Sequence, residues 1–187
     1  QQEVLATPAL VTLAPKAKQL IRLTRLAPPP QEAERAYRLI VDEVPRAAMN
    51  RENASGDGKA GQGSAVNFRM RYSLPLFSYA PNINPEKPTG EPQLAWRVME
   101  TQAGPRIEIS NQGRIHARLT AAKISSGGQE WELSGGLLGY VLPGRSMDFP
   151  LPEQMSASAA QGATLSLSVN GAAAIALSKY QPADSKP

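Results

Sequence analysis

The chain has 187 residues, no cysteine, and a net charge of +4 from 20 basic and 16 acidic residues. Without cysteine there can be no disulfide, thiol catalysis or cysteine metal site. The charge excess is small and dispersed, and aromatic residues make up only 5% of the chain, so nucleic acid is not an expected partner. No apolar run reaches the roughly 18 residues of a membrane helix. We therefore expect a soluble globular chain that is not membrane-embedded.

The first half of the chain carries strand signals separated by proline and glycine. Short apolar or alternating runs predict strands at residues 4–7 (the weakest candidate), 10–13, 19–26 and 36–44. Residues 46–64 are polar and rich in glycine, which predicts a long loop. The longest strand candidate follows it at residues 65–77.

The second half has more strands, and they are shorter and more evenly spaced. Turn residues separate seven candidates at residues 94–100, 105–111, 114–124, 130–133, 137–142, 164–169 and 173–177. This spacing is typical of an immunoglobulin-like β-sandwich. The sequence therefore predicts an all-β chain of two such domains, residues 1–84 and 94–179, with a linker at 85–93 and a disordered tail at 180–187. The first domain has too few strands, so either strands preceding Gln1 are missing from this sequence or another molecule supplies them.

Residues 65–77 alternate throughout. One face carries Val66, Phe68, Met70, Tyr72 and Leu74, while the other face is polar. The strand is either a central one with its apolar face on the domain's own core, or an edge strand that shares these side chains with a second protein. Exposed strand edges offer unpaired backbone groups, and added strands use them for binding.

Glu43 ends the strand Y-R-L-I-V-D-E-V-P of residues 37–45 and shares a face with Tyr37, Leu39 and Val41. A buried carboxylate needs a partner. Glu43 therefore either pairs with a basic residue or ends the strand in water.

Enzymatic chemistry has little support. His116 is the single histidine, so neither a histidine-rich zinc site nor a supported Ser–His–Asp triad is present. The glycine-rich segments lack the G-K-[ST] of a phosphate-binding loop. We expect no enzyme, no cofactor and no metal.

Six motifs in collinear order carry a family resemblance over residues 4 to about 178. They are A-T-P-A-L-V-T-L-A-P (6–15), Q-L-I-R-L (19–23), E-R-A-Y-R-L-I-V-D-E-V-P (34–45), R-Y-S-L-P-L-F (71–77), N-Q-G-R-I-H-A-R-L (111–119) and G-Y-V-L-P-G (139–144). The sequence resembles periplasmic pilus-assembly chaperones of the chaperone–usher pathway. The S-L-P-L-F ending and the lack of cysteine are most similar to the archaic branch that assembles Csu-type pili.

This resemblance implies two immunoglobulin-like domains set at an angle, and a periplasmic chaperone that binds pilin subunits and delivers them to the outer-membrane usher. Residues 65–77 would be the strand donated to each subunit, with Val66, Phe68, Met70, Tyr72 and Leu74 inserted into it. The alternative function is a structural or adhesive β-sandwich protein of a surface or pilus, which would keep its partner permanently.

The resemblance also implies a basic anchor for the subunit's C-terminal carboxylate, for which Arg22 and Arg71 are the candidates. A guanidinium can hold a carboxylate with two parallel hydrogen bonds. The alternatives are a structural pair with Glu43 for Arg22, and a solvated charge for Arg71. Glu43 matches the family's acid that helps form a salt bridge between the domains, with Arg22 or a basic residue of the second domain as partner.

Overall fold

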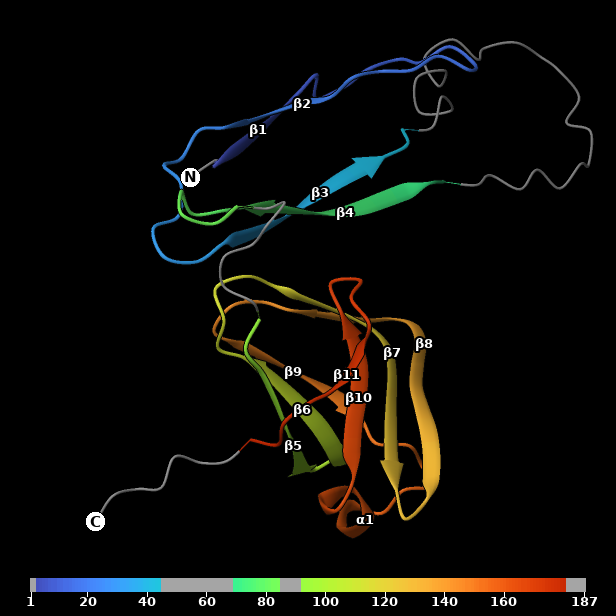
Figure 1. Cartoon of the computed structure of the whole chain (residues 1–187). Helices are drawn as coiled ribbons and strands as arrows, with labels where there is room; N and C mark the ends of the chain where they lie inside the picture. Colours follow the sequence, from blue (N-terminus) through green and yellow to red (C-terminus); the bar gives the residue numbers. More distant parts are fainter. Residues whose placement is uncertain (1–2, 45–68, 85–91, 181–187) are drawn as a thin grey trace, which may run out of the picture. The chain divides into compact units, whose positions relative to one another are not determined.

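The structure is a computed structural model that describes residues 3–44, 69–84 and 92–180 (Figure 1). Almost all of its regular structure is β-strand, which confirms the predicted all-β class. The chain divides into two compact units, one formed by Gln1–Glu34 with Ser78–Pro187 and the other by Arg35–Phe77. Each is described here by itself. No helix in the described ranges is long and apolar enough to cross a membrane.

The larger part of the first unit is a β-sandwich. One sheet has the order β5 (Leu94–Thr101), β6 (Gly104–Asn111), β9 (Arg145–Pro150). The other has the order β11 (Ala174–Ala176), β10 (Thr164–Val169), β7 (Ala117–Ser126), β8 (Gln129–Val141). A short helix, α1 (Ala157–Gln161), begins at the N-cap Ser156, whose hydroxyl accepts a hydrogen bond from the Ala159 N–H.

Side chains from both sheets form one core, because alternate residues of a strand share a face. Trp96 of β5 and Ile107 and Ile109 of β6 are buried together with Leu119 of β7 and Leu167 of β10. Burial of apolar surface on two facing sheets is what stabilises such a sandwich.

A buried polar side chain, Asn111, closes one end of this core. Its amide donates to the carbonyls of Ile115 and Val141, at 2.8 and 3.0 Å, and its oxygen accepts from the N–H groups of Gln93 and Gly113. All four of its hydrogen-bonding positions are therefore satisfied, as a polar group at 1% exposure requires.

Besides the two sheets of the sandwich, the described residues form two further pairs of strands. In the first unit β1 (Val4–Thr7) pairs antiparallel with β2 (Arg22–Arg25), and in the second unit β3 (Arg35–Asp42) pairs with β4 (Arg71–Ser78). The strand predicted at residues 4–7 is present. The strand predicted at 10–13 is wrong, because residues 8–21 contain no strand. The predicted strands 130–133 and 137–142 are one continuous strand, β8.

Candidate functional site

Strands β3 and β4 form a two-stranded ribbon, and they lie side by side in Figure 1. The N–H of Glu43 donates to the carbonyl of Met70 at 3.0 Å, and the guanidinium of Arg38 donates to the Ser73 hydroxyl at 3.0 Å. From Arg38 forward to Glu43 the contact partner moves back from Ser73 to Met70, so the two strands run antiparallel.

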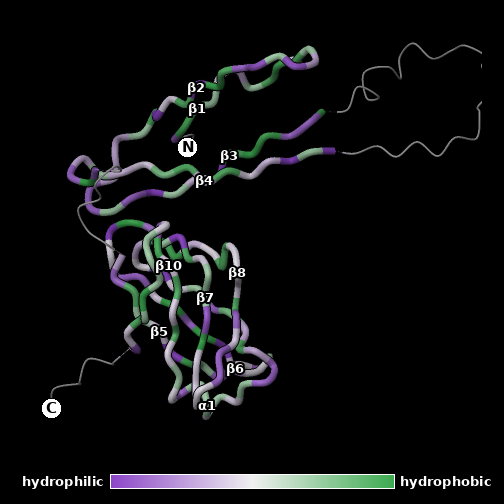
Figure 2. Tube along the Cα trace, turned by 45° about the vertical axis from the view of Figure 1, so that its right-hand side comes forward, coloured by the Kyte–Doolittle hydropathy of each residue, from purple (hydrophilic) through white to green (hydrophobic). Residues whose placement is uncertain are grey.

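The ribbon exposes large apolar side chains. Met70, Tyr72 and Leu74 are 57%, 53% and 48% exposed, and these are the described members of the alternating face expected to be donated. Val66 and Phe68 of that face lie outside the described residues. In Figure 2 parts of β3 and β4 are green, the colour of hydrophobic residues, and so are parts of the strands of the sandwich. The ribbon leaves Met70, Tyr72 and Leu74 about half exposed, whereas the core side chains of the sandwich are buried.

Arg71 does not stand as an isolated charge. Its Nε and Nη2 donate to the two carboxylate oxygens of Asp42, at 2.6 and 2.9 Å. The hydrogen bond from Arg71 lowers the pKa of Asp42 below its usual range, and the same bond raises the pKa of Arg71. The pair lies on the surface, with 71% of the Arg71 side chain exposed, so it is open to exchange with another carboxylate.

Glu43 continues the same end of the ribbon. Its side chain is exposed, and one of its oxygens accepts a hydrogen bond from the Met70 N–H at 3.3 Å. Together with Asp42, Val44, Arg69 and Arg71 it lines a pocket of about 320 Å³. The carboxylate thus caps the strand pair in the structure, and its salt bridge to the second domain stays a prediction.

Arg22, the other candidate anchor, is the first residue of β2 and is exposed. It lies in the first unit, whereas Arg71 lies in the second. The role of either residue as a carboxylate anchor stays a prediction.

The sequence reasoning missed an acid, Glu34. Its side chain is fully buried, and both of its oxygens contact Nδ1 of His116, at 2.9 and 2.8 Å, within the first unit. The sequence supports neither a zinc site nor a catalytic triad at His116, and it indicates no partner for this residue. The two residues are 82 positions apart, so no local pattern joins them.

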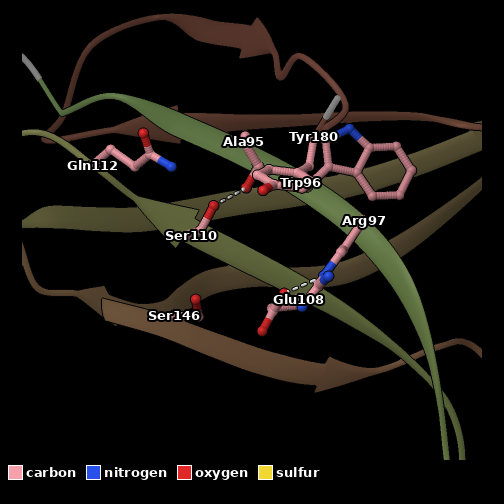
Figure 3. Close-up of a pocket in the computed structure, with 8 residues that line it drawn as sticks. All are labelled: Ala95, Trp96, Arg97, Glu108, Ser110, Gln112, Ser146 and Tyr180. Atoms are coloured by element: carbon pink, nitrogen blue, oxygen red, sulfur yellow. Dashed lines mark hydrogen bonds and ion pairs between the residues drawn. The ribbon is translucent and has the colours of Figure 1, made fainter. Parts of the chain in front are cut away.

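A second pocket, of about 210 Å³, lies on β5 and β6 (Figure 3). Arg97 and Glu108 form an ion pair in it, and the guanidinium of Arg97 lies 5.6 Å from the ring centroid of Tyr180. The hydroxyl of Ser110 donates to the carbonyl of Ala95.

Comparison with known proteins gives a family match in the N-terminal part. Residues 1–83 match the model of the pili and flagellar-assembly chaperone family, PapD N-terminal domain. A search of curated protein sequences finds no significant match.

Solved structures of chaperones share the fold. The chain is similar to CsuC in the CsuC–CsuE chaperone–tip adhesion subunit pre-assembly complex from the archaic chaperone–usher Csu pili of Acinetobacter baumannii. That match has a TM-score of 0.68 and 27% identity, and it covers 97% of this chain and 76% of the other. The CupB2 chaperone of Pseudomonas aeruginosa (TM-score 0.61, 17% identity, 96% and 76% covered) and the YadV chaperone (0.64, 15%, 93% and 76%) match in fold.

These findings confirm the resemblance that the sequence motifs indicate. The all-β immunoglobulin-like fold is that of pilus chaperones, and the expectation of a non-enzymatic protein is confirmed by the same relatives. The chain is thus similar to the pilus-assembly chaperones of the chaperone–usher pathway, in its N-terminal part by the family match and over nearly its whole length by its likeness to the chaperone of the archaic Csu pili.

Proposed function

We propose that this chaperone binds pilin subunits in the periplasm by lending them β4 as an additional strand, and that it then delivers them to the outer-membrane usher. The observation that carries the proposal is the exposure of Tyr72 and Leu74 on one face of β4 and of Met70 directly before it. A subunit that lacks a strand exposes an apolar groove, and an alternating apolar strand is the shape that fills it.

Strand addition needs an accessible backbone edge as well as side chains. Among the residues that the structure describes, β4 pairs with β3 alone, so its other edge offers N–H and C=O groups to an incoming strand. The backbone hydrogen bonds would supply affinity independent of sequence, and the exposed side chains would supply selectivity. A chaperone of this kind binds without ATP, since burial of apolar surface drives the association.

The similarity to CsuC, which was crystallised with a tip adhesion subunit, supports a pilus subunit as the class of partner. We include the carboxylate anchor in the proposal and favour Arg71 for it. Arg71 lies on the proposed donor strand, and its bidentate contact with Asp42 supports the choice, because a guanidinium would hold a subunit's C-terminal carboxylate through the same two hydrogen bonds.

The test is co-expression of the chaperone with a pilin subunit and co-purification through a tag on the chaperone. Tyr72→Glu combined with Leu74→Glu places two charges on the donated face and should abolish recovery of soluble pilin. The matched control is Leu137→Glu, because Leu137 of β8 is as exposed as Tyr72, at 53% each, but lies on the sandwich. Recovery of pilin with the double variant at the level of the control would refute the donated strand.

A further inference from the structure

The inference concerns the contact between Glu34 and His116, which we call the Glu34–His116 clasp. Besides the two oxygen contacts to Nδ1, Oε1 of Glu34 accepts a hydrogen bond from the His116 N–H at 2.9 Å. The N–H of Glu34 donates in turn to the carbonyl of Arg114 at 3.1 Å. The clasp thus uses the backbone and side chain of both residues, and it fixes the residue directly before β3 to the segment that enters β7.

The clasp lies in apolar surroundings. The carboxylate of Glu34 is fully buried, and the His116 side chain is 15% exposed. Ile115, next to His116, belongs to a small apolar cluster with Ala80 and Ile83 of the segment that follows β4, and Tyr79 of that segment packs on the cluster. A buried carboxylate loses its hydration, so the charge of its contact partner matters more there than at a surface.

His116 can meet this carboxylate in two states. As a neutral imidazole with a proton on Nδ1 it donates one ordinary hydrogen bond to Glu34, whereas as an imidazolium it adds the attraction between opposite charges. We propose that the Glu34–His116 clasp is a pH-sensitive contact, which holds the Glu34 segment on the sandwich tightly when His116 is protonated and loosely when it is neutral.

Other charged and titratable groups lie close to the clasp. The charge of Glu34 acts on Tyr79, and the ring centroid of Tyr140 on β8 lies 5.8 Å from that of His116. Glu32 and Arg35 are near Glu34 in the sequence, and Arg114 and Arg118 are near His116, with the Arg114 guanidinium bonded to the Glu32 carbonyl. Burial first, and the charge of Glu34 second, raise the pKa of Tyr79, so that phenol stays neutral. None of these side-chain types ordinarily changes charge between pH 5.5 and 8, whereas histidine is the side-chain type that ordinarily does.

The direction of the effect follows from the state that binds better. The imidazolium strengthens the clasp, so the added stability is present at acidic pH and is lost at higher pH, where the imidazole is neutral. Charge-assisted hydrogen bonds exceed neutral ones enough for a five- to tenfold change, roughly, in the opening equilibrium.

Two amides report on the clasp, because the N–H groups of Glu34 and His116 are both bonded within it. We would measure their hydrogen exchange by NMR in the full chain at pH 5.5 and pH 8, corrected for the intrinsic exchange rate. The expected protection is about five- to tenfold greater at pH 5.5. The amide of Leu177, bonded to the carbonyl of Leu165 in the sandwich, serves as a control that should not change. His116 is the single histidine, so its ring signals give the protonation state in the same samples.

Two variants separate the clasp from general effects of pH. Glu34→Gln keeps the shape but removes the charge, and His116→Arg keeps a cation at both pH values. Both should abolish the difference in protection between the two conditions. Equal protection in the wild type at pH 5.5 and 8 would overturn the proposal, as would a Glu34→Gln protein that keeps the wild-type pH dependence. If Glu34→Gln does not fold, a pH dependence retained by His116→Arg overturns it equally.

Discussion

Strands β7 and β4 carry a similar alternation of apolar and polar residues, yet they meet different surroundings. In β7 Ala117 and Leu119, and after an irregularity in the strand Ala122 and Ile124, are fully buried between two sheets. In β4 the alternate residues Tyr72 and Leu74 are about half exposed on a two-stranded ribbon. Alternation therefore specifies that a strand has an apolar face, but it does not specify what covers that face. In the sandwich a second sheet covers it, and in the ribbon we propose that a pilin does.

The sharpest way to break this comparison is to remove the same side chain from each region. Leu167→Ala in β10 deletes a fully buried side chain and should lower the free energy of unfolding by about 2–5 kcal/mol. Leu74→Ala in β4 removes a side chain that is 48% exposed and should cost less than about 1 kcal/mol. Urea unfolding followed by far-UV circular dichroism, which reports on strands in both units, measures both.

Equal costs for the two variants would contradict the comparison, because they would mean that the ribbon buries Leu74 as fully as the sandwich buries Leu167. Ile175→Ala, at 51% exposure on β11, is the matched control on the sandwich for the effect of losing an exposed apolar side chain.

The sandwich strands could be predicted where burial on one face imposes the alternation, as in β6 and β10. Strand β9 (Arg145–Pro150) was not predicted, because R-S-M-D-F-P contains two charges and a proline. It becomes a strand through its pairing with β6, where Arg106 bonds Asp148. The total of seven strands in residues 92–180 agrees with the expected seven only because β8 merges two candidates while β9 adds one.

Apolar content misled the prediction near the N-terminus. Leu10, Val11 and Leu13 read as a strand, but they are exposed and lie in a segment without regular structure. The alternation of residues 10–13 suits a strand, but within the part of the chain that the structure describes no neighbouring strand pairs with them. Propensity is overridden by tertiary context in this way.

The candidate site could be predicted only in part for the same reason. The alternation of Met70, Tyr72 and Leu74 can be predicted from the sequence. Whether these side chains are exposed depends on which strands surround them, and the sequence does not show that. The partner of Arg71, Asp42, follows from the pairing register of β3 with β4, which no spacing in the sequence fixes across residues 45–68. The Glu34–His116 pair is likewise a product of the fold.

The second prediction concerns the function of the ribbon, namely the binding of a subunit's C-terminal carboxylate. If Arg71 anchors a subunit's carboxylate, Arg71→Ala should weaken binding about tenfold or more, since a charge-assisted bidentate contact is lost. The measurement is titration with a synthetic peptide of the pilin's last strand, prepared with a C-terminal carboxylate or a C-terminal amide. The amide should bind the wild type about as weakly as the carboxylate binds Arg71→Ala.

Arg38→Ala is the control for this experiment, because Arg38 lies on the same ribbon and bonds a neutral hydroxyl, that of Ser73. Asp42→Asn releases Arg71 from its intramolecular partner and should leave the affinity equal or higher. An affinity of Arg71→Ala equal to that of the wild type would exclude Arg71 as the anchor and leave Arg22 as the candidate.

The smallest expected effect concerns the Asp42–Arg71 pair itself. Because the hydrogen bond from Arg71 lowers the pKa of Asp42, the pair's favourable contribution is present at neutral pH and is lost as the pH falls through that lowered pKa. Arg71→Ala should therefore move the pKa of Asp42 upward, toward the ordinary aspartate value near about 3.9. Carbon-detected NMR of the Asp42 carboxyl between pH 2 and 6 measures the change. A carboxyl that titrates identically in both proteins would show that the pair does not persist in solution. Because the pair is exposed, added salt should reduce the difference between the Asp42 pKa values of the two proteins.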